Sequence, residues 1–153
     1  MKRELTEKVV RIVEDNKNDL IEILQQLVRI PSVNPPGKYD EITDLMVQLY
    51  QAEGLAPVVA TAPKADVEKL GLTYPRPNVI ARYEGKDHNP VFCLDAHTDV
   101  VGIDGESLWE YPPFAAQIHD SKIFGRGTAD TKAHLAAQLI AFSNRLEIIN
   151  STI

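Results

Sequence analysis

The chain has 153 residues, with 16 basic and 22 acidic side chains and a formal net charge of −6. Hydrophobic residues make up 44% and charged residues 25%, which are the proportions of a globular domain and exclude a disordered, collagen-like or coiled-coil polypeptide. The acidic balance without a Lys/Arg cluster argues against a nucleic-acid partner, and the lack of a long apolar run argues against a membrane span. Cys93 is the single cysteine, which excludes an internal disulfide, so we expect a cytoplasmic chain of one domain.

Helical periodicity dominates the first thirty residues. A period near 3.6 is set by Leu20, Ile21, Ile23, Leu24, Leu27 and Val28. Asn18 or Asp19 can cap the start of this predicted helix. An earlier apolar stripe over residues 5–13 either continues into the same helix or is broken from it near Asn16.

Proline ends the first helical part of the chain. Pro31 lacks an N–H and disfavours the α conformation at Ile30, so the helix must end there. Segment 31–37 (PSVNPPG) is rich in breakers and predicts a loop. A second helix is predicted from about residue 41 to 52, with Gly54 in the position of a C-terminal stop.

Strand patterns follow the second helix. Residues 57–61, 78–84 and 91–96 are candidate strands, and the last is almost wholly apolar, as a strand buried on both faces tends to be. The charged segment 62–77 between them predicts a surface excursion. Alternation of helices and strands indicates the α/β class.

The last part of the chain predicts a hairpin and a helix. Residues 116–119 and 122–124 are short strand candidates on either side of Asp120-Ser121. A final helix should start near Asp130, with Leu135, Leu139, Phe142 and Leu146 on one side.

His97 and Asp99 form the first candidate site, at the end of the apolar strand candidate. Side chains two residues apart on a strand point to the same face, so the Asp99 carboxylate can orient the imidazole while the other ring nitrogen binds a metal. The alternative interpretation is a histidine that is simply hydrogen-bonded at a strand end.

Asp130 is the second candidate site, because a glycine-rich turn (GRGTADTK, residues 125–132) delivers its carboxylate to the start of the last helix. The spacing does not match a phosphate-binding loop. Asp130 alone is explained by N-capping of that helix, and a metal ligand can also sit at a cap.

Five separated blocks of the sequence together resemble one family. They are LVRIPSVNPPG (27–37), PNVIARYEG (77–85), LDAHTDVV (94–101), WEYPPF (109–114) and GRGTADTK (125–132). In this order they resemble the first half of the catalytic domain of the zinc amidohydrolases and peptidases. That family includes acetylornithine deacetylase, succinyl-diaminopimelate desuccinylase, aminoacylase and glutamate carboxypeptidase.

The resemblance implies a fold and a set of residue roles. The fold would be a three-layer α/β/α domain with a mixed sheet, as in zinc exopeptidases. His97 would bind one of two zinc ions, Asp99 would orient His97, and Asp130 would bridge both ions. Similar enzymes have a cis peptide after the bridging aspartate, here between Asp130 and Thr131.

The sequence departs from the family pattern after Asp130. Residues 131–134 are TKAH, where the family usually has Met-Lys-Gly-Gly. The family's Glu-Glu pair, its remaining ligands and its lid and dimerisation domain would fall beyond Ile153. Glu147 is not a convincing substitute for the general base. We therefore expect residues 1–153 to be an N-terminal part of a truncated catalytic domain with an incomplete zinc site.

The expected function is hydrolysis of amide bonds in N-acyl amino acids or small peptides, with the chain nearly inactive alone. The alternative is a non-catalytic remnant, a binding module or one half of a split enzyme. An apolar sheet edge without partners would favour self-association. The remaining candidates are weaker: Cys93 on the face of His97 is read as a buried small hydrophobe, and His134 as a solvent-facing helix residue. His88 and His119 are read as surface residues, and Trp109 with Phe114 as loop packing.

Overall fold

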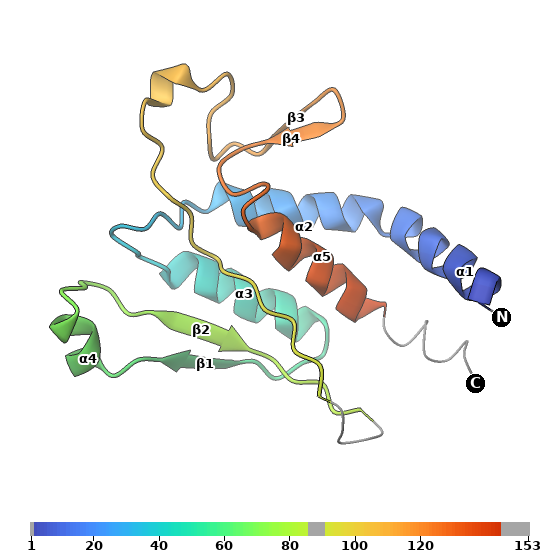
Figure 1. The fold of residues 1–153 in the computed structure, drawn as a ribbon, viewed down its shortest axis with the longest axis horizontal. Helices are drawn as coiled ribbons and strands as arrows, with labels where there is room; N and C mark the ends of the chain where they lie inside the picture. Colours follow the sequence, from blue (N-terminus) through green and yellow to red (C-terminus); the bar gives the residue numbers. More distant parts are fainter. Residues whose placement is uncertain (1, 86–90, 145–153) are drawn as a thin grey trace.

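The computed structural model describes residues 2–85 and 91–144, in which helices predominate over short strands (Figure 1). In chain order the elements are α1 (Lys2–Asp15), α2 (Lys17–Arg29), α3 (Asp40–Ala52), β1 (Val58–Thr61), α4 (Lys64–Lys69), β2 (Pro77–Ile80), the 3-10 turn η1 (Glu106–Leu108), β3 (Gln117–His119), β4 (Lys122–Phe124) and α5 (Lys132–Ser143). The prediction of mixed helices and strands is confirmed.

The first thirty residues form two helices rather than one. The break falls at Asn16, whose side-chain amide donates to the carbonyl of Ile12 at 2.8 Å and so competes with a continuous helix. Asn16 is the N-cap of α2 and makes no side-chain cap hydrogen bond, so the expected capping by Asn18 or Asp19 is wrong. The helix ends at Arg29, before Pro31, as predicted.

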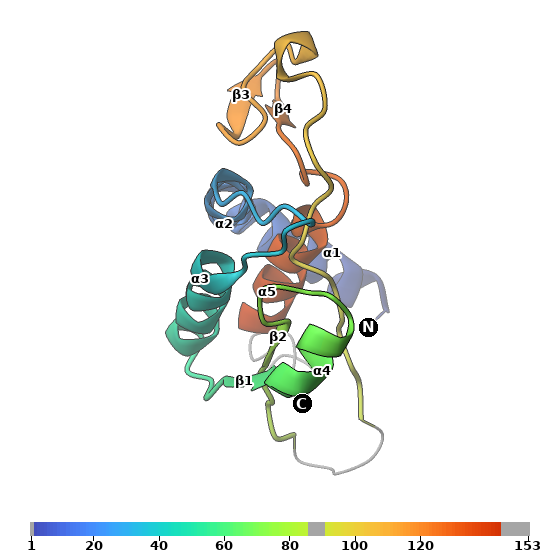
Figure 2. The ribbon, with the colours of Figure 1, turned by 90° about the vertical axis from the view of Figure 1, so that its left-hand side faces the viewer.

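The core lies where α2, α3 and α5 meet (Figures 1 and 2). Leu27 and Val28 of α2 are fully buried, and Ile42 and Met46 of α3 and Ala136 of α5 are nearly or fully buried with them. The apolar stripes read from the sequence thus face one another. The end of α2 and the start of α5 are therefore held together, and both adjoin the candidate site residues.

Two small antiparallel sheets flank this core. β1 pairs with β2, with Val58 opposite Ile80 and Thr61 opposite Pro77. Between these two strands, the predicted surface excursion contains α4. The predicted hairpin is formed by β3 and β4, with Ile118 opposite Ile123.

The expected buried strand over residues 91–96 is wrong. The segment forms no strand and pairs with none of the described strands, and β1 and β2 pair only with each other. Val91 is 75% exposed and Phe92 85% exposed, so both faces are open at the start of the segment, whereas Ala96 at its end packs against the core. The preceding strand candidate, residues 78–84, is also shorter than expected, since β2 ends at Ile80.

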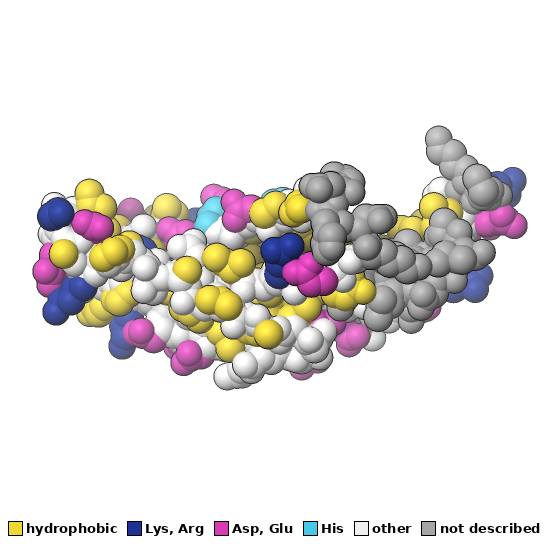
Figure 3. All heavy atoms as spheres, turned by 90° about the horizontal axis from the view of Figure 1, so that it is seen from below, with side chains coloured by type: hydrophobic (Ala, Val, Ile, Leu, Met, Phe, Trp, Pro, Cys, Tyr) yellow, Lys and Arg dark blue, Asp and Glu magenta, His cyan; other side chains and the backbone are white. Residues whose placement is uncertain are grey.

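The described residues therefore hold two separate two-stranded sheets, and the single mixed sheet of a three-layer domain is not formed among them. Val58 and Ile80, opposite each other in the first sheet, are 63% and 55% exposed. Figure 3 views the side of the molecule on which β1 and β2 lie in Figure 1, and hydrophobic side chains gather on it. Among residues 2–85 and 91–144, no helix is long and apolar enough to cross a membrane.

Candidate metal site

His97 lies in an extended segment that a loop holds in place. The loop that follows α2 supplies a parallel bridge between Val33 and Val100, in which the Val100 N–H donates to the Ser32 carbonyl at 3.0 Å. The fully buried Ser32 hydroxyl also donates to the carbonyl of Thr98 at 2.6 Å. Three residues after His97 the chain is therefore fixed to the end of α2.

Asp130 is delivered by the glycine turn, as the sequence predicts. Gly127 has φ +89°, and a Cβ on it would lie 2.7 Å from Cγ1 of Val100, so this position requires glycine. The peptide bond between Asp130 and Thr131 is cis, as the family resemblance implies. The N-cap of α5 is Thr131 and not Asp130, so the capping interpretation of Asp130 is wrong. Its side chain is 90% exposed.

Lys132 is a buried residue of this region that the sequence analysis did not single out. Its ammonium donates to the carbonyls of Leu27 and Ile30, both at 2.8 Å, at the end of α2. Burial lowers the pKa of Lys132 from 10.5 to about 8. No sequence pattern predicts this contact, because lysine is almost never fully buried and its partners lie about a hundred residues earlier in the chain. The ammonium ties the start of α5 to the loop that holds residues 98–100.

The three predicted site residues come together. The Nε2 atom of His97 lies 3.0 Å from Oδ1 of Asp130. On the other side of the ring, Nδ1 lies 3.0 Å from the carbonyl oxygen of Asp99 and 3.2 Å from its carboxylate Oδ1. The sequence prediction that Asp99 can orient His97 agrees with this geometry.

The electrostatics of His97 favour a cation at this place. Partial burial lowers the pKa of His97, but the hydrogen bonds to the Asp99 carbonyl and the Asp130 carboxylate, with the charges of both carboxylates, outweigh it and raise the pKa. A neutral imidazole that donates from Nδ1 to Asp99 turns the lone pair of Nε2 toward a carboxylate oxygen. Two acceptors facing each other need a proton or a metal ion between them.

The His97 and Asp130 pair also fits the size of a zinc site. With zinc-to-ligand distances of about 2.0–2.2 Å and tetrahedral angles, two ligand atoms of one ion lie roughly 3.3–3.5 Å apart. The observed 3.0 Å between Nε2 and Oδ1 is close to that separation. The Asp99 carboxylate is turned to the far side of the ring, so it can orient His97 but does not face the same ion.

The described residues do not complete a metal site. In residues 2–85 and 91–144, no group of three or more histidine, cysteine, aspartate and glutamate side chains is arranged to hold a metal ion. His97 and Asp130 are thus two converging candidate ligands, fewer than the three or four that zinc usually takes from protein.

The weaker candidates take no part in this geometry. Cys93 is exposed, so its interpretation as a buried hydrophobe is wrong. His134 is exposed on α5, as expected, and its Nδ1 lies 2.6 Å from the Thr131 hydroxyl. His119 is an exposed residue stacked on Tyr111. The side chains of His88 and Glu147 lie outside the described residues.

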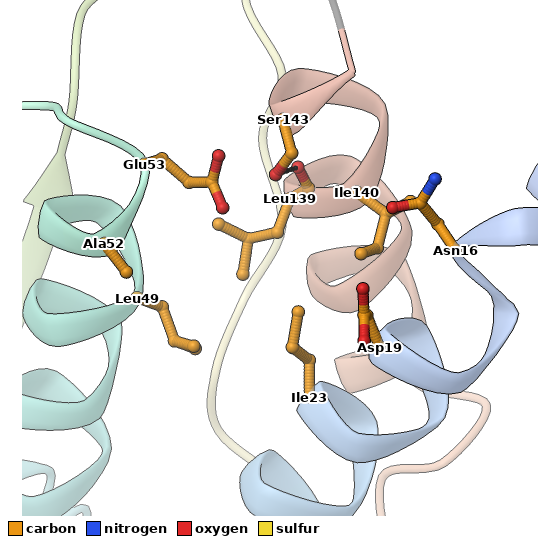
Figure 4. Close-up of a pocket in the computed structure, with 9 residues that line it drawn as sticks. All are labelled: Asn16, Asp19, Ile23, Leu49, Ala52, Glu53, Leu139, Ile140 and Ser143. Carbon is orange, nitrogen blue, oxygen red and sulfur yellow. Dashed lines mark hydrogen bonds between the residues drawn. The ribbon is translucent and has the colours of Figure 1, made fainter. Parts of the chain in front are cut away.

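A cavity of about 270 Å³ lies elsewhere, between α2, the end of α3 and the last turns of α5 (Figure 4). Its lining is mainly apolar, with Ile23, Leu49 and Leu139 among the lining side chains. The carboxylates of Asp19 and Glu53 and the hydroxyl of Ser143 also line it. None of the predicted site residues lines it. The candidate site, the pair of His97 and Asp130, therefore lies outside this cavity.

Two comparisons relate the chain to known proteins. Residues 93–150, which include His97, Asp99 and Asp130, match peptidase family M20/M25/M40. The chain is 31% identical over 149 residues to N-formyl-4-amino-5-aminomethyl-2-methylpyrimidine deformylase of Halalkalibacterium halodurans. The match covers 92% of this chain and 31% of the relative, so the chain spans about a third of that protein's length.

These two matches confirm the resemblance read from the five sequence blocks, and they support peptidase family M20/M25/M40 as the family of this region.

Proposed function

We propose that this chain carries the first ligands of a zinc site in an enzyme that hydrolyses amide bonds. His97 and Asp130 bind zinc, and Asp99 orients His97. The observation that carries the proposal is the approach of His97 Nε2 to Asp130 Oδ1 at 3.0 Å, with the opposite ring nitrogen held by Asp99. A metal ion removes the conflict between these two acceptors.

A zinc ion held in such a site would polarise the amide carbonyl and would lower the pKa of a bound water. The residues of this chain would hold the ion and orient the imidazole of His97. Among the described residues, the second carboxylate oxygen of Asp130 has no hydrogen-bond partner, and the side chain is 90% exposed. This leaves Asp130 able to bridge to a second zinc ion. Further ligands and a glutamate that accepts the proton of the water must be supplied from outside the described residues.

The proposed substrates are N-acyl amino acids or small peptides. The name of the matched relative describes removal of a formyl group from a nitrogen, which is hydrolysis of an amide bond. Its substrate by name is a pyrimidine and not a peptide, so the shared chemistry is the N-acyl bond.

The proposed working arrangement has one larger sheet. Segment 91–96, whose first residues are exposed on both faces, becomes a strand of a mixed sheet between helical layers, and His97 then lies at the end of that strand. Phe92, at 85% exposed, offers apolar area for this pairing and also for self-association. The exposed segment equally favours one half of a split enzyme as a second candidate. In either arrangement the isolated 153-residue chain is nearly inactive. A location in the cytoplasm stays a prediction.

Zinc binding tests the proposed function directly. Isothermal titration of the 153-residue chain with Zn²⁺ should show binding that His97→Ala and Asp130→Ala each weaken by about tenfold or more. His119→Ala is the matched control, since it removes an exposed histidine outside the site and should leave the affinity unchanged. Equal affinity of the wild type and the His97→Ala and Asp130→Ala variants would refute the assignment.

A further inference from the structure

The side chain of Asn34 in the proline-rich loop 31–37 has no role in the proposed function, although this loop belongs to one of the five blocks that carry the family resemblance. The structure brings one of its side chains to the site. The side-chain amide of Asn34 donates to Oδ2 of Asp99 at 3.3 Å. Asn34 and Asp99 are 65 residues apart in the chain, so only the fold creates this contact.

The contact occupies the oxygen of Asp99 that His97 leaves free. Oδ1 lies 3.2 Å from Nδ1 of His97, and Oδ2 accepts from Asn34. A carboxylate held at one oxygen can rotate about its Cβ–Cγ bond. Held at both oxygens, the Asp99 carboxylate keeps Oδ1 on the ring nitrogen and does not turn toward the metal ligands.

Backbone contacts fix Asn34 for this purpose. Its N–H donates to the carbonyl of Val100 at 2.9 Å, one residue beyond Asp99. On its other side the loop closes with a hydrogen bond of 2.9 Å from the Gly37 N–H to the Val33 carbonyl. Gly37 has φ +77° and its carbonyl accepts from Arg76 at 2.8 Å. The Asn34 amide is therefore presented to Asp99 by a loop that is tied at both ends.

We propose that Asn34 is a positioning residue of the zinc site, which acts on His97 through the carboxylate of Asp99. This inference rests on the proposed function for the identity of the metal, but the Asn34–Asp99–His97 chain of contacts belongs to the protein itself. The side chain of Asn34 contacts the Asp99 carboxylate, and through it acts on His97. It keeps the Asp99 carboxylate on Nδ1, so that Nε2 is the ring nitrogen that faces Asp130.

Asn34→Leu tests this role, because leucine has a similar size and no donor. Asn34 is exposed, so the variant should keep the fold, and circular dichroism checks this. Asn18→Leu, at an exposed position of α2, is the matched control. Zn²⁺ titration should show an affinity about three- to fivefold weaker for Asn34→Leu, less than the tenfold or more expected for Asp99→Ala.

A double-variant cycle separates this role from a structural one. In the Asp99→Ala background, Asn34→Leu should change the Zn²⁺ affinity by less than about 1.5-fold, since its route to His97 is already lost. Equal, additive losses in both backgrounds would overturn the proposal.

The metal-free protein gives an independent readout. The ¹⁵N NMR shift of His97 Nδ1 should move in Asn34→Leu in the same direction as in Asp99→Ala, and by less. If the chain binds no Zn²⁺ and the shifts move as expected, the metal assignment fails and the positioning role of Asn34 stands. Unchanged His97 shifts in Asn34→Leu overturn the positioning role, whatever the zinc result.

Discussion

Lys132 gives the sharpest test of the packing behind the site. Its ammonium is fully buried and donates to the carbonyls of Leu27 and Ile30. Burial lowers its pKa from 10.5 to about 8, so between these values the unfolded chain holds a proton that the folded chain lacks. Unfolding free energy must then rise with pH across that window, by about 3 kcal/mol in total at 1.36 kcal/mol per pKa unit. The gain is lost again as the pH falls to about 8.

Lys132→Met removes the titrating group and keeps most of the side-chain length. Urea unfolding followed by circular dichroism, in buffer with a metal chelator, gives the unfolding free energy at each pH. From about pH 7.5 to 9.3 the wild type should gain about 1.5 kcal/mol relative to Lys132→Met. This range stays below the region in which tyrosine side chains titrate in the unfolded chain.

Lys38→Met is the matched control, because Lys38 is exposed in the loop before α3. It should follow the pH dependence of the wild type. A difference between wild type and Lys132→Met that stays constant over this pH range would show that the ammonium is not desolvated, and the packing of α5 against the end of α2 would have to be revised.

Three further changes test other parts of the structure. Gly127→Ala should lower the unfolding free energy by about 1–3 kcal/mol in urea unfolding, because φ is +89° and the new Cβ would meet Val100; an unchanged midpoint would contradict this geometry. Phe92→Ser should change stability by less than about 0.5 kcal/mol, since Phe92 is 85% exposed, and should reduce oligomers in size-exclusion chromatography; equal elution profiles would argue against self-association there. Replacing Asp120-Ser121 by Asn-Gly should raise the thermal midpoint slightly, because both turn residues have positive φ (48° and 60°); a lower midpoint would refute the assigned turn.

Sequence patterns predicted those helices and turns that depend on residues close together in the chain. The period of apolar residues marked α2, α3 and α5, Pro31 marked the end of α2, and Asp120-Ser121 marked the β3–β4 turn. These follow from backbone sterics and the alignment of side chains on one helix face, which depend on near neighbours in the chain.

Segment 91–96 shows where such patterns fail. Its apolar composition predicted a buried strand, but burial and strand pairing need a partner, and the described residues provide none to this segment. Composition indicates that a segment can form a buried strand, but it does not indicate whether a neighbouring strand is present to pair with it.

Five ordered blocks were enough to predict the family, and His97, Asp99 and Asp130 were predicted as site residues because they lie in those blocks. The contacts of Asp130 with His97 Nε2, of Asn34 with Asp99, and of Lys132 with the end of α2 could be seen only in the folded chain. Each of these contacts joins residues at least 33 positions apart, and such distances along the chain are bridged by the packing of α2 and α5 and by the Val33–Val100 bridge rather than by any local pattern.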